Sequence, residues 1–355
     1  MATDRARLGL IRTEVAKALE QFTARQRGIL AAISDDMLPW LAAMDGLLAG
    51  GKRLRPAFCY WGWRAAGGPE CDEIYAAAAC LELLQASALI HDDVMDASDT
   101  RRGRPAVHRQ FAARHAAEGY AGSADQFGTG AAILLGDALL AWTDELYHDS
   151  GFGPDVLQRG QTAFDAMRTE VAAGQYLDLV SQSGRDPSVA AALRVITYKT
   201  AKYTIERPLQ LGAALAGGPA ELLATFSGYG LPLGIAFQLR DDVLGVFGDP
   251  ARTGKPVTGD ISEGKRTVLV ALARERADAA QIRLLDRCLG DRDLAPADAQ
   301  RVRAVIADTG ALAECEALIA ASVKEAITAL DGAPVPAEAR DALVDLAVLA
   351  TDRDD

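Results

Sequence analysis

The stretch Leu89-Ile-His-Asp-Asp-Val-Met-Asp-Ala-Ser-Asp-Thr-Arg-Arg-Gly-Arg-Pro105 decides how the rest of the chain is interpreted. The segment 76–90 before it is rich in alanine and leucine and contains no proline or glycine, which predicts a helix. Helical residues four apart lie on one face, so we expect Asp92 and Asp96 to point the same way. Carboxylates placed in this way repel each other unless a cation lies between them, and a site of oxygen ligands suits Mg²⁺. The stretch therefore indicates a metal site.

Two arginines and a second acidic pair extend this interpretation. Arg101 and Arg102 follow the aspartates and offer planar forks to phosphate oxygens. The second pair, Asp241-Asp242, stands in the similar setting Phe237-Gln-Leu-Arg-Asp-Asp-Val-Leu-Gly. Further acidic pairs at 35–36 and 354–355 are typical of a helix start and a solvated tail. The combination favours a metal and phosphate site over two unrelated acidic turns.

The composition predicts an all-α protein. Half of the 355 residues are apolar and only 6% are aromatic, which fits a helical bundle better than a sheet protein. The length would accommodate two domains, but both aspartate motifs must face one cavity to act together, so we expect one domain over residues 1–355. The net charge of −12 argues against a nucleic-acid partner, because phosphate backbones need clustered Lys and Arg.

The cysteines and the N-terminal residues favour a cytoplasmic location. The five cysteines form no C-x-x-C pair, so they suggest neither a disulfide framework nor a zinc site. Residues 1–8 carry charges where a signal peptide would need an apolar run, and we expect no transmembrane segment.

The chain resembles the trans-isoprenyl diphosphate synthases of the polyprenyl synthetase family, most closely a bacterial geranylgeranyl diphosphate synthase. The motifs that carry the resemblance stand in family order: Gly50-Gly-Lys-Arg-Leu-Arg-Pro56, the first aspartate motif with its arginine tail, Gly174-Gln175, Lys199-Thr200, Phe237-Gln-Leu-Arg-Asp-Asp242 and Gly264-Lys-Arg-Thr267. The resemblance implies a single-domain helical bundle of the isoprenoid synthase type, with two facing aspartate-rich helices around a central cavity. It also implies a homodimer that uses Mg²⁺, with Mn²⁺ as a substitute, to join isopentenyl diphosphate to an allylic diphosphate.

The resemblance assigns a role to each matching residue. The metal ligands are Asp92, Asp93, Asp96, Asp241 and Asp242. Isopentenyl diphosphate is bound by Lys52, Arg55, Gln85 and Arg102. The allylic diphosphate is bound by Arg101, Lys199, Thr200, Gln238, Lys255 and Lys265, with Gln175 in support near the metal. For the cations 52–55, a solvated turn is the alternative interpretation.

The second aspartate motif departs from the commonest family pattern at one position. Gly245 stands where a third aspartate is often found, so the number of metal ligands on this side is open. Asp249 follows too far along a regular helix to replace it directly. Glycine and small polar residues predict a loop over residues 116–130, and glycine and proline predict another over residues 249–267.

The helix before the first motif bears on the length of the product. Family members that stop at fifteen carbons tend to carry an aromatic ring four or five residues before the first aspartate, where this chain has Ala88 and Ser87. Leu84 and Leu81 offer a deeper floor, with Trp142 of a neighbouring helix as a further candidate. We therefore expect mainly geranylgeranyl diphosphate, with farnesyl and longer products as alternatives.

Two other functions remain as alternatives. A class I terpene cyclase also uses an aspartate-rich helix, but it has no use for the cations at 52–55. A non-catalytic subunit of a heteromeric synthase would be expected to lose aspartates from the first motif, whereas this chain keeps all three.

Overall fold

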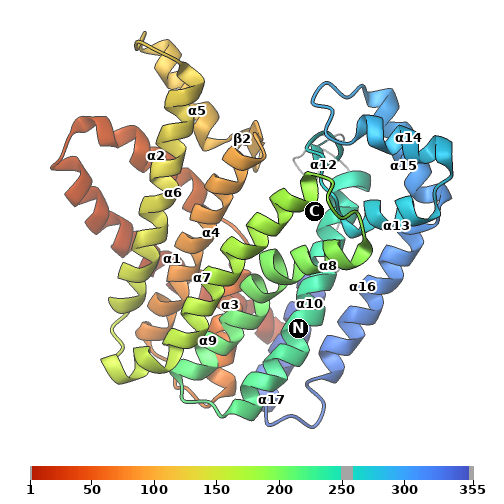
Figure 1. Ribbon diagram of the computed structural model, residues 1–355. Coiled ribbons are helices and arrows are strands. Elements are labelled where there is room, and N and C mark those ends of the chain that lie inside the picture. Colours follow the sequence, from red (N-terminus) through yellow and green to blue (C-terminus); the bar gives the residue numbers. More distant parts are fainter. Residues whose placement is uncertain (1, 249–258, 352–355) are drawn as a thin grey trace. The chain divides into compact units, whose positions relative to one another are not determined.

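The computed structural model describes residues 2–248 and 259–351 (Figure 1). These residues are helical apart from turns and one hairpin whose two strands have two residues each. The predicted all-α class is therefore confirmed. They form two compact units, Met1–Gln161 with Leu211–Gly218 and Thr162–Gln210 with Pro219–Asp355. The single domain and the facing aspartate helices stay predictions. Lys255 and Asp249 lie outside the described residues.

The first unit is built around α4. Its elements are α1 (Ala2–Ala31), η1 (Asp35–Met37), α2 (Leu38–Leu48), α3 (Leu54–Ala65), α4 (Asp72–Met95), β1 (Thr100–Arg101), β2 (Arg104–Pro105), α5 (Val107–Ala117), α6 (Ala124–His148) and the start of α7 (Pro154–Gln182). Helix α4 packs against α1, α3 and α6. Leu81, Leu83 and Leu84 at its centre are fully buried, so the helix that carries the first aspartate motif is the core of its unit.

The loop expected over residues 116–130 is shorter than predicted. Helix α5 continues to Ala117, and α6 already begins at Ala124. Ser123 caps α6 because its hydroxyl accepts a hydrogen bond from the Gln126 amide at 3.3 Å. A Cβ at Gly128 would lie 2.1 Å from the carbonyl oxygen of His108, so this glycine permits α6 to approach α5 closely. Gly128 therefore serves helix packing, whereas Gly119 and Gly122, both with positive φ, lie in the turn between the two helices.

The second unit is built around α10. Besides the rest of α7 it contains α8 (Val189–Ile196), η2 (Thr197–Glu206), the start of α9 (Arg207–Leu215), α10 (Ala220–Phe247), α12 (Gly259–Ser262), α13 (Val268–Arg276), α14 (Ala279–Cys288), α15 (Pro296–Asp308), α16 (Ala311–Thr328) and α17 (Ala337–Thr351). Helix α10 packs against α16 and η2. Arg240 binds both carboxylate oxygens of Glu316, at 2.6 and 2.8 Å, which joins α10 to α16. The short α12 lies inside the predicted loop 249–267.

Two helices are long and apolar enough to cross a membrane by length and composition, α4 and α10. Of the most apolar 18-residue stretch of each helix, 72% is buried inside the protein in α4 and 50% in α10. Burial of this kind is typical of core helices, and we interpret both helices in that way.

Candidate active site

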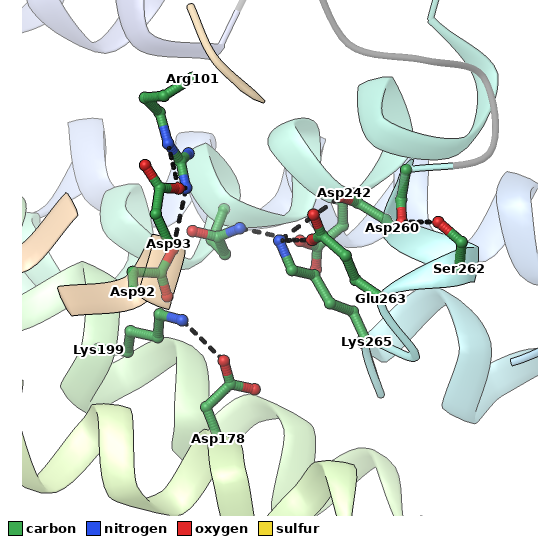
Figure 2. A network of polar contacts seen from close by, with 12 residues as sticks. Asp92, Asp93, Arg101, Asp178, Lys199, Asp242, Asp260, Ser262, Glu263 and Lys265 are labelled. Atoms are coloured by element: carbon green, nitrogen blue, oxygen red, sulfur yellow. Dashed lines mark hydrogen bonds and ion pairs between the residues drawn. The ribbon is translucent and has the colours of Figure 1, made fainter. Parts of the chain in front are cut away.

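The first aspartate motif lies at the C-terminal end of α4. Asp92 and Asp93 belong to its last turn, and Asp96 is the residue that ends it. Arg101 reaches back to this turn: its Nε donates to Asp93 Oδ1 at 2.8 Å and its Nη2 donates to Asp92 Oδ2 at 3.2 Å (Figure 2). Asp93 is only 1% exposed and Asp96 only 3%. A guanidinium group thus compensates carboxylates that would otherwise repel each other in a buried place.

Arg101 is positioned by a tight hairpin. Thr100 pairs with Pro105 and Arg101 with Arg104, which leaves Arg102-Gly103 as a two-residue turn. Both turn residues have positive φ, 53° and 71°, as the preferred hairpin turns require. An arginine in this conformation costs about 1 kcal/mol or more and persists only where the surroundings impose it. The arginine tail of the motif is therefore held in one conformation.

The segment at residues 50–55 is fixed by a buried ion pair. Arg53, with a φ of 51°, donates from its guanidinium to Glu82 of α4 and to the carbonyl oxygen of Leu48. Both Arg53 and Glu82 are buried. The carbonyl oxygen of Lys52 accepts a hydrogen bond from Arg12 Nε at 3.1 Å. Of the three cations in this segment, Arg53 is used inside the protein, and its role could not be told from that of its neighbours by sequence.

Positive charge gathers beside the hairpin in the first unit. A surface hollow is lined in part by Arg101, Arg102 and Arg104. Burial lowers the pKa of the Arg102 guanidinium, and the charges of Arg53, Arg101 and Arg55 lower it further against the opposing effect of Glu82. A bound anion would relieve this repulsion, so the arrangement favours an anionic ligand.

The predicted chain-length residues and Gln85, which is predicted to bind isopentenyl diphosphate, divide between two environments. Gln85, Ala88 and Asp92 are half-buried and follow one another at helical spacing on α4. Ser87, Leu84 and Leu81 are buried. The structure therefore places Gln85 and Ala88 on the face of α4 that leads to the first aspartate, and places the other three inside the unit.

Lys199 and Thr200 of the second unit lie in a π-helix, η2. Two glycines permit close approach to its backbone. A Cβ at Gly174 of α7 would lie 2.3 Å from the Lys199 nitrogen, and a Cβ at Gly234 of α10 would lie 2.3 Å from the Ala201 Cα. π-Turns are rare and frequently occur at functional sites, which agrees with the position of the motif lysine.

Hydrogen bonds connect η2 to the second aspartate motif on α10. The hydroxyl of Thr200 donates to Gln238 Oε1 at 2.8 Å, and Gln238 Nε2 donates to Asp242 Oδ1 at 2.8 Å. Lys199 Nζ donates to Asp178 Oδ2 at 2.7 Å (Figure 2). Gln175, like Asp178, belongs to α7 and is half-buried. The structure thus brings four predicted residues, Lys199, Thr200, Gln238 and Asp242, into one connected region.

Asp242 has a strongly perturbed acidity. Its side chain is buried, with 6% of the residue exposed. Burial raises its pKa to about 8, the negative charges of Asp260 and Asp241 raise it further, and the Gln238 hydrogen bond and Lys265 oppose them. At neutral pH and without a metal, this carboxyl group is therefore largely protonated.

Three acidic residues of this region were missed by the sequence analysis as site residues. Asp178 pairs with Lys199, while Lys265 Nζ lies 2.9 Å from Glu263 Oε2 and 3.5 Å from Asp260 Oδ1 (Figure 2). Asp260 and Glu263 precede Lys265 in the same short segment, which is a signal that sequence reading could have used. The pairing of Asp178 with Lys199 depends on tertiary contact and leaves no such signal.

The donor atoms suit a magnesium ion that also binds phosphate. Within residues 2–248 and 259–351, no three His, Cys, Asp or Glu side chains are gathered closely enough to hold a metal by themselves. The motif side chains are nevertheless carboxylates, which are hard oxygen donors. Mg²⁺ usually keeps several waters and is bound by one or two carboxylates together with substrate phosphates. The residues present therefore fit this ion.

Comparisons with known proteins agree with this chemistry. The family model described as polyprenyl synthetase matches residues 39–308. A geranylfarnesyl diphosphate synthase of Aeropyrum pernix is 34% identical over 307 residues, which cover 85% of this chain and 90% of that one. An all-trans-nonaprenyl-diphosphate synthase of Rhodobacter capsulatus is 30% identical over 342 residues, 96% of this chain and 97% of that one.

A solved structure resembles the chain over nearly its whole length. The geranylgeranyl pyrophosphate synthase of Corynebacterium glutamicum, complexed with isoprenyl diphosphate and magnesium, is 41% identical with a TM-score of 0.93, and the match covers 97% of this chain and 98% of that one. This likeness confirms the predicted isoprenoid synthase fold. The matching enzymes elongate prenyl chains. The chain belongs to the polyprenyl synthetase family and is a prenyltransferase.

Proposed function

We propose that the protein catalyses the Mg²⁺-dependent head-to-tail condensation of isopentenyl diphosphate with dimethylallyl, geranyl or farnesyl diphosphate. The observation that carries the proposal is the arginine hairpin after α4. Arg101 compensates the carboxylates of the first motif, while Arg102 stands among like charges that favour an anion. A metal-assisted diphosphate reaction needs both features. Mn²⁺ is expected to substitute for Mg²⁺.

The two substrates are held by different residues in this proposal. Asp92, Asp93, Asp96, Asp241 and Asp242 hold the metal, and Gln175 supports them. The allylic diphosphate is bound by Arg101, Lys199, Thr200, Gln238, Lys255 and Lys265. Isopentenyl diphosphate is bound by Lys52, Arg55, Gln85 and Arg102. Mg²⁺ held by these carboxylates would stabilise the negative charge that grows on the leaving diphosphate.

The reaction begins when the allylic C–O bond breaks and its electron pair stays on the diphosphate. The double bond of isopentenyl diphosphate attacks the allylic cation, and the resulting cation loses a proton to the departing diphosphate. The product is five carbons longer. Water would capture the cation, so apolar side chains of the α4 core must exclude it.

We further propose geranylgeranyl diphosphate as the main product. Small residues, Ala88 and Ser87, precede the first aspartate, and Leu84 and Leu81 lie deeper on α4. The 41% identical corynebacterial protein is named for this product. Geranylfarnesyl and nonaprenyl synthases among the relatives keep longer products as the alternative, and a farnesyl product remains the shorter one.

Radiolabelled isopentenyl diphosphate tests the activity when it is supplied with each allylic diphosphate separately. We expect incorporation with every primer and a twenty-carbon alcohol after dephosphorylation and chromatography. A terpene cyclase would instead release diphosphate from an allylic substrate alone, and a non-catalytic subunit would incorporate no label. Either result would contradict the proposal.

We also propose a cytoplasmic homodimer. Exposed apolar side chains on α6, Phe127, Ile133, Leu134 and Leu140, favour self-association because so much apolar surface on one helix is uncommon in a monomer. Sedimentation velocity of the purified protein measures this directly, and a monomer at micromolar concentration would contradict it.

A further inference from the structure

The position at which the second aspartate motif lacks a carboxylate is filled from another helix. Gly245 is half-buried in α10. A Cβ built on it would lie 1.7 Å from Asp260 Oδ2 and 2.7 Å from the carboxylate carbon of Asp260. No side chain fits at position 245 while Asp260 keeps this place. The carboxylate of Asp260 therefore occupies the space into which a side chain at position 245 would extend.

Asp260 is held firmly beside α10. It begins the short helix α12 with Gly259, and only 7% of it is exposed. The next residue, Ile261, is 1% exposed and packs in the same apolar cluster as Val243 and Val246 of α10. The carbonyl oxygen of Ile261 also accepts a hydrogen bond from the Gly290 amide at 2.9 Å. Packing on both sides thus fixes where the Asp260 carboxylate lies.

The charge of Asp260 acts on the second motif. Its carboxylate lies against Gly245, which is one helical turn along α10 from Asp241 and Asp242, so its negative charge stands next to the motif. Lys265 Nζ lies 3.5 Å from Asp260 Oδ1 and provides partial compensation. Negative charge placed in a buried region beside two motif carboxylates raises the affinity for a divalent cation.

We propose that Asp260 supplies the third negative charge of the second aspartate motif in place of the side chain that Gly245 lacks. The inference rests on the proposed function and deepens it, because it adds a residue to the site that receives metal and diphosphate. No three such acidic side chains in the described residues surround one point. Asp260 therefore acts on the ion through its charge and not as one of three preassembled ligands.

Binding of inorganic pyrophosphate in the presence of Mg²⁺, followed by isothermal titration calorimetry of the full chain, tests the inference without catalysis. Asp260→Asn removes the charge and keeps the size of the side chain. We expect it to weaken Mg²⁺-dependent pyrophosphate binding by about 10-fold or more, as outer residues of metal sites typically do. Asp308→Asn, an equal charge change at an exposed residue of α15, serves as the control and should bind like the unchanged protein.

Moving the carboxylate from position 260 to position 245 shows whether Asp260 supplies charge to the site or only supports the structure. Asp260→Ala should weaken binding as Asp260→Asn does, and the double change Gly245→Asp/Asp260→Ala should return affinity to within about 3-fold of the unchanged protein, a difference of less than 1 kcal/mol. Thermal melts confirm that each variant is folded. If the double change binds no better than Asp260→Ala, Asp260 acts only as the partner of Lys265 and the proposal is overturned.

The remaining outcomes separate the two proposals. If the unchanged protein binds pyrophosphate with Mg²⁺ and Asp260→Asn binds equally well, the inference alone is wrong. If the unchanged protein shows no Mg²⁺-dependent binding at all, the proposed function fails, and the inference fails with it.

Discussion

The two aspartate motifs carry the same residue pair but compensate its charge in different ways. At the end of α4, Arg101 binds Asp92 and Asp93 directly. On α10, Asp242 accepts a hydrogen bond from a neutral amide, that of Gln238. The first motif also keeps its own third aspartate, whereas the second has Gly245 beside a carboxylate from another helix.

The protonation of a carboxyl group in an Asp-Asp pair therefore depends on what surrounds it. A guanidinium group in contact favours the charged form of a carboxyl group, and burial without such contact favours the neutral form. The pKa of Asp242 is accordingly raised to about 8. Asp242 of the second motif therefore needs an added cation to become fully charged. The first motif already has a cation in contact, the guanidinium group of Arg101.

Removal of the metal or of a first-motif carboxylate should have the largest effect. EDTA should abolish condensation, and Asp92→Ala should lower kcat by about 10³-fold, because the loss of several kcal/mol of charge stabilisation is expected. Arg101 still binds Asp93 in this variant, so the fold should survive. Steady-state assays and thermal melts measure both effects.

The exposed Asp35 provides the matched control, since it also begins an Asp-Asp pair. Asp35→Ala should retain full activity. Condensation that continues in EDTA would show that the first motif needs only the Arg101 cation and would remove the proposed contrast.

The lysines of the two units should affect different substrates. Lys52→Ala is expected to raise the KM for isopentenyl diphosphate by about 10- to 100-fold, and Lys199→Ala the KM for the allylic diphosphate, because each loses a charge-assisted hydrogen bond to phosphate. Initial rates with one substrate saturating separate the constants. The exposed Lys324→Ala is the control. Equal effects of each substitution on both KM values would mean that the residues are assigned to the wrong diphosphate.

Helices with a clear apolar pattern could be predicted from sequence, whereas features that depend on tertiary contact could not. The segment 76–90 is helical as predicted, because its long run of alanine and leucine is free of proline and glycine. Gly128 was misread as a loop signal, since its closeness to His108 cannot be seen in the chain order. The π-helix at Lys199 likewise depends on glycines of α7 and α10.

The same limit applies to the site. The first motif could be interpreted in full because its carboxylates and Arg101 are neighbours in the chain. The sequence shows that Gly245 departs from the family pattern of three aspartates. The carboxylate beside it belongs to Asp260, which follows a segment whose sequence has no regular apolar pattern. Only packing of Ile261 against α10 reveals that Asp260 lies there.

The raised pKa of Asp242 predicts how the metal-free protein responds to pH. The ordinary value of 3.8 applies to the unfolded chain and about 8 to the folded one, so the folded state binds the proton more tightly. Proton binding by Asp242 therefore stabilises the folded state. This contribution is fully present below pH 3.8 and is lost as pH rises through about 8, the pKa in the folded protein. Asp242→Asn should abolish this loss, so the stability gained by the substitution should be about 3 to 4 kcal/mol larger at pH 8 than at pH 5.

Urea unfolding in EDTA between pH 5 and 8 measures the difference between Asp242→Asn and the unchanged protein. Asp308→Asn controls for the removal of one negative charge. If the difference does not vary with pH, Asp242 is charged in the metal-free protein, and the two motifs are more alike than proposed.

The smallest expected effect is a change in the chain length of the product. It depends on one position at which the two helices that carry the aspartate motifs differ. Four residues before the first aspartate of each pair, α10 carries Phe237 and α4 carries Ala88. Ala88 lies on the half-buried face of α4 that leads to Asp92, so a ring there would enter the space ahead of the motif. Ala88→Phe makes the helices alike at this position and should shift the product from twenty toward fifteen carbons.

Ser87 offers the contrast that decides whether this face of α4 sets the length. It is only 3% exposed, so Ser87→Phe must force a ring into a packed interior at a cost of about 1 to 3 kcal/mol. We expect Ser87→Phe to lower the melting temperature and to shorten the product less cleanly than Ala88→Phe, which should change product length with little loss of stability. Chromatography of the dephosphorylated products, read beside melting curves, separates the two effects. If Ala88→Phe leaves the product distribution unchanged, the growing chain does not follow the face of α4 that carries Gln85 and Asp92, and its length is limited by another part of the first unit or by the second.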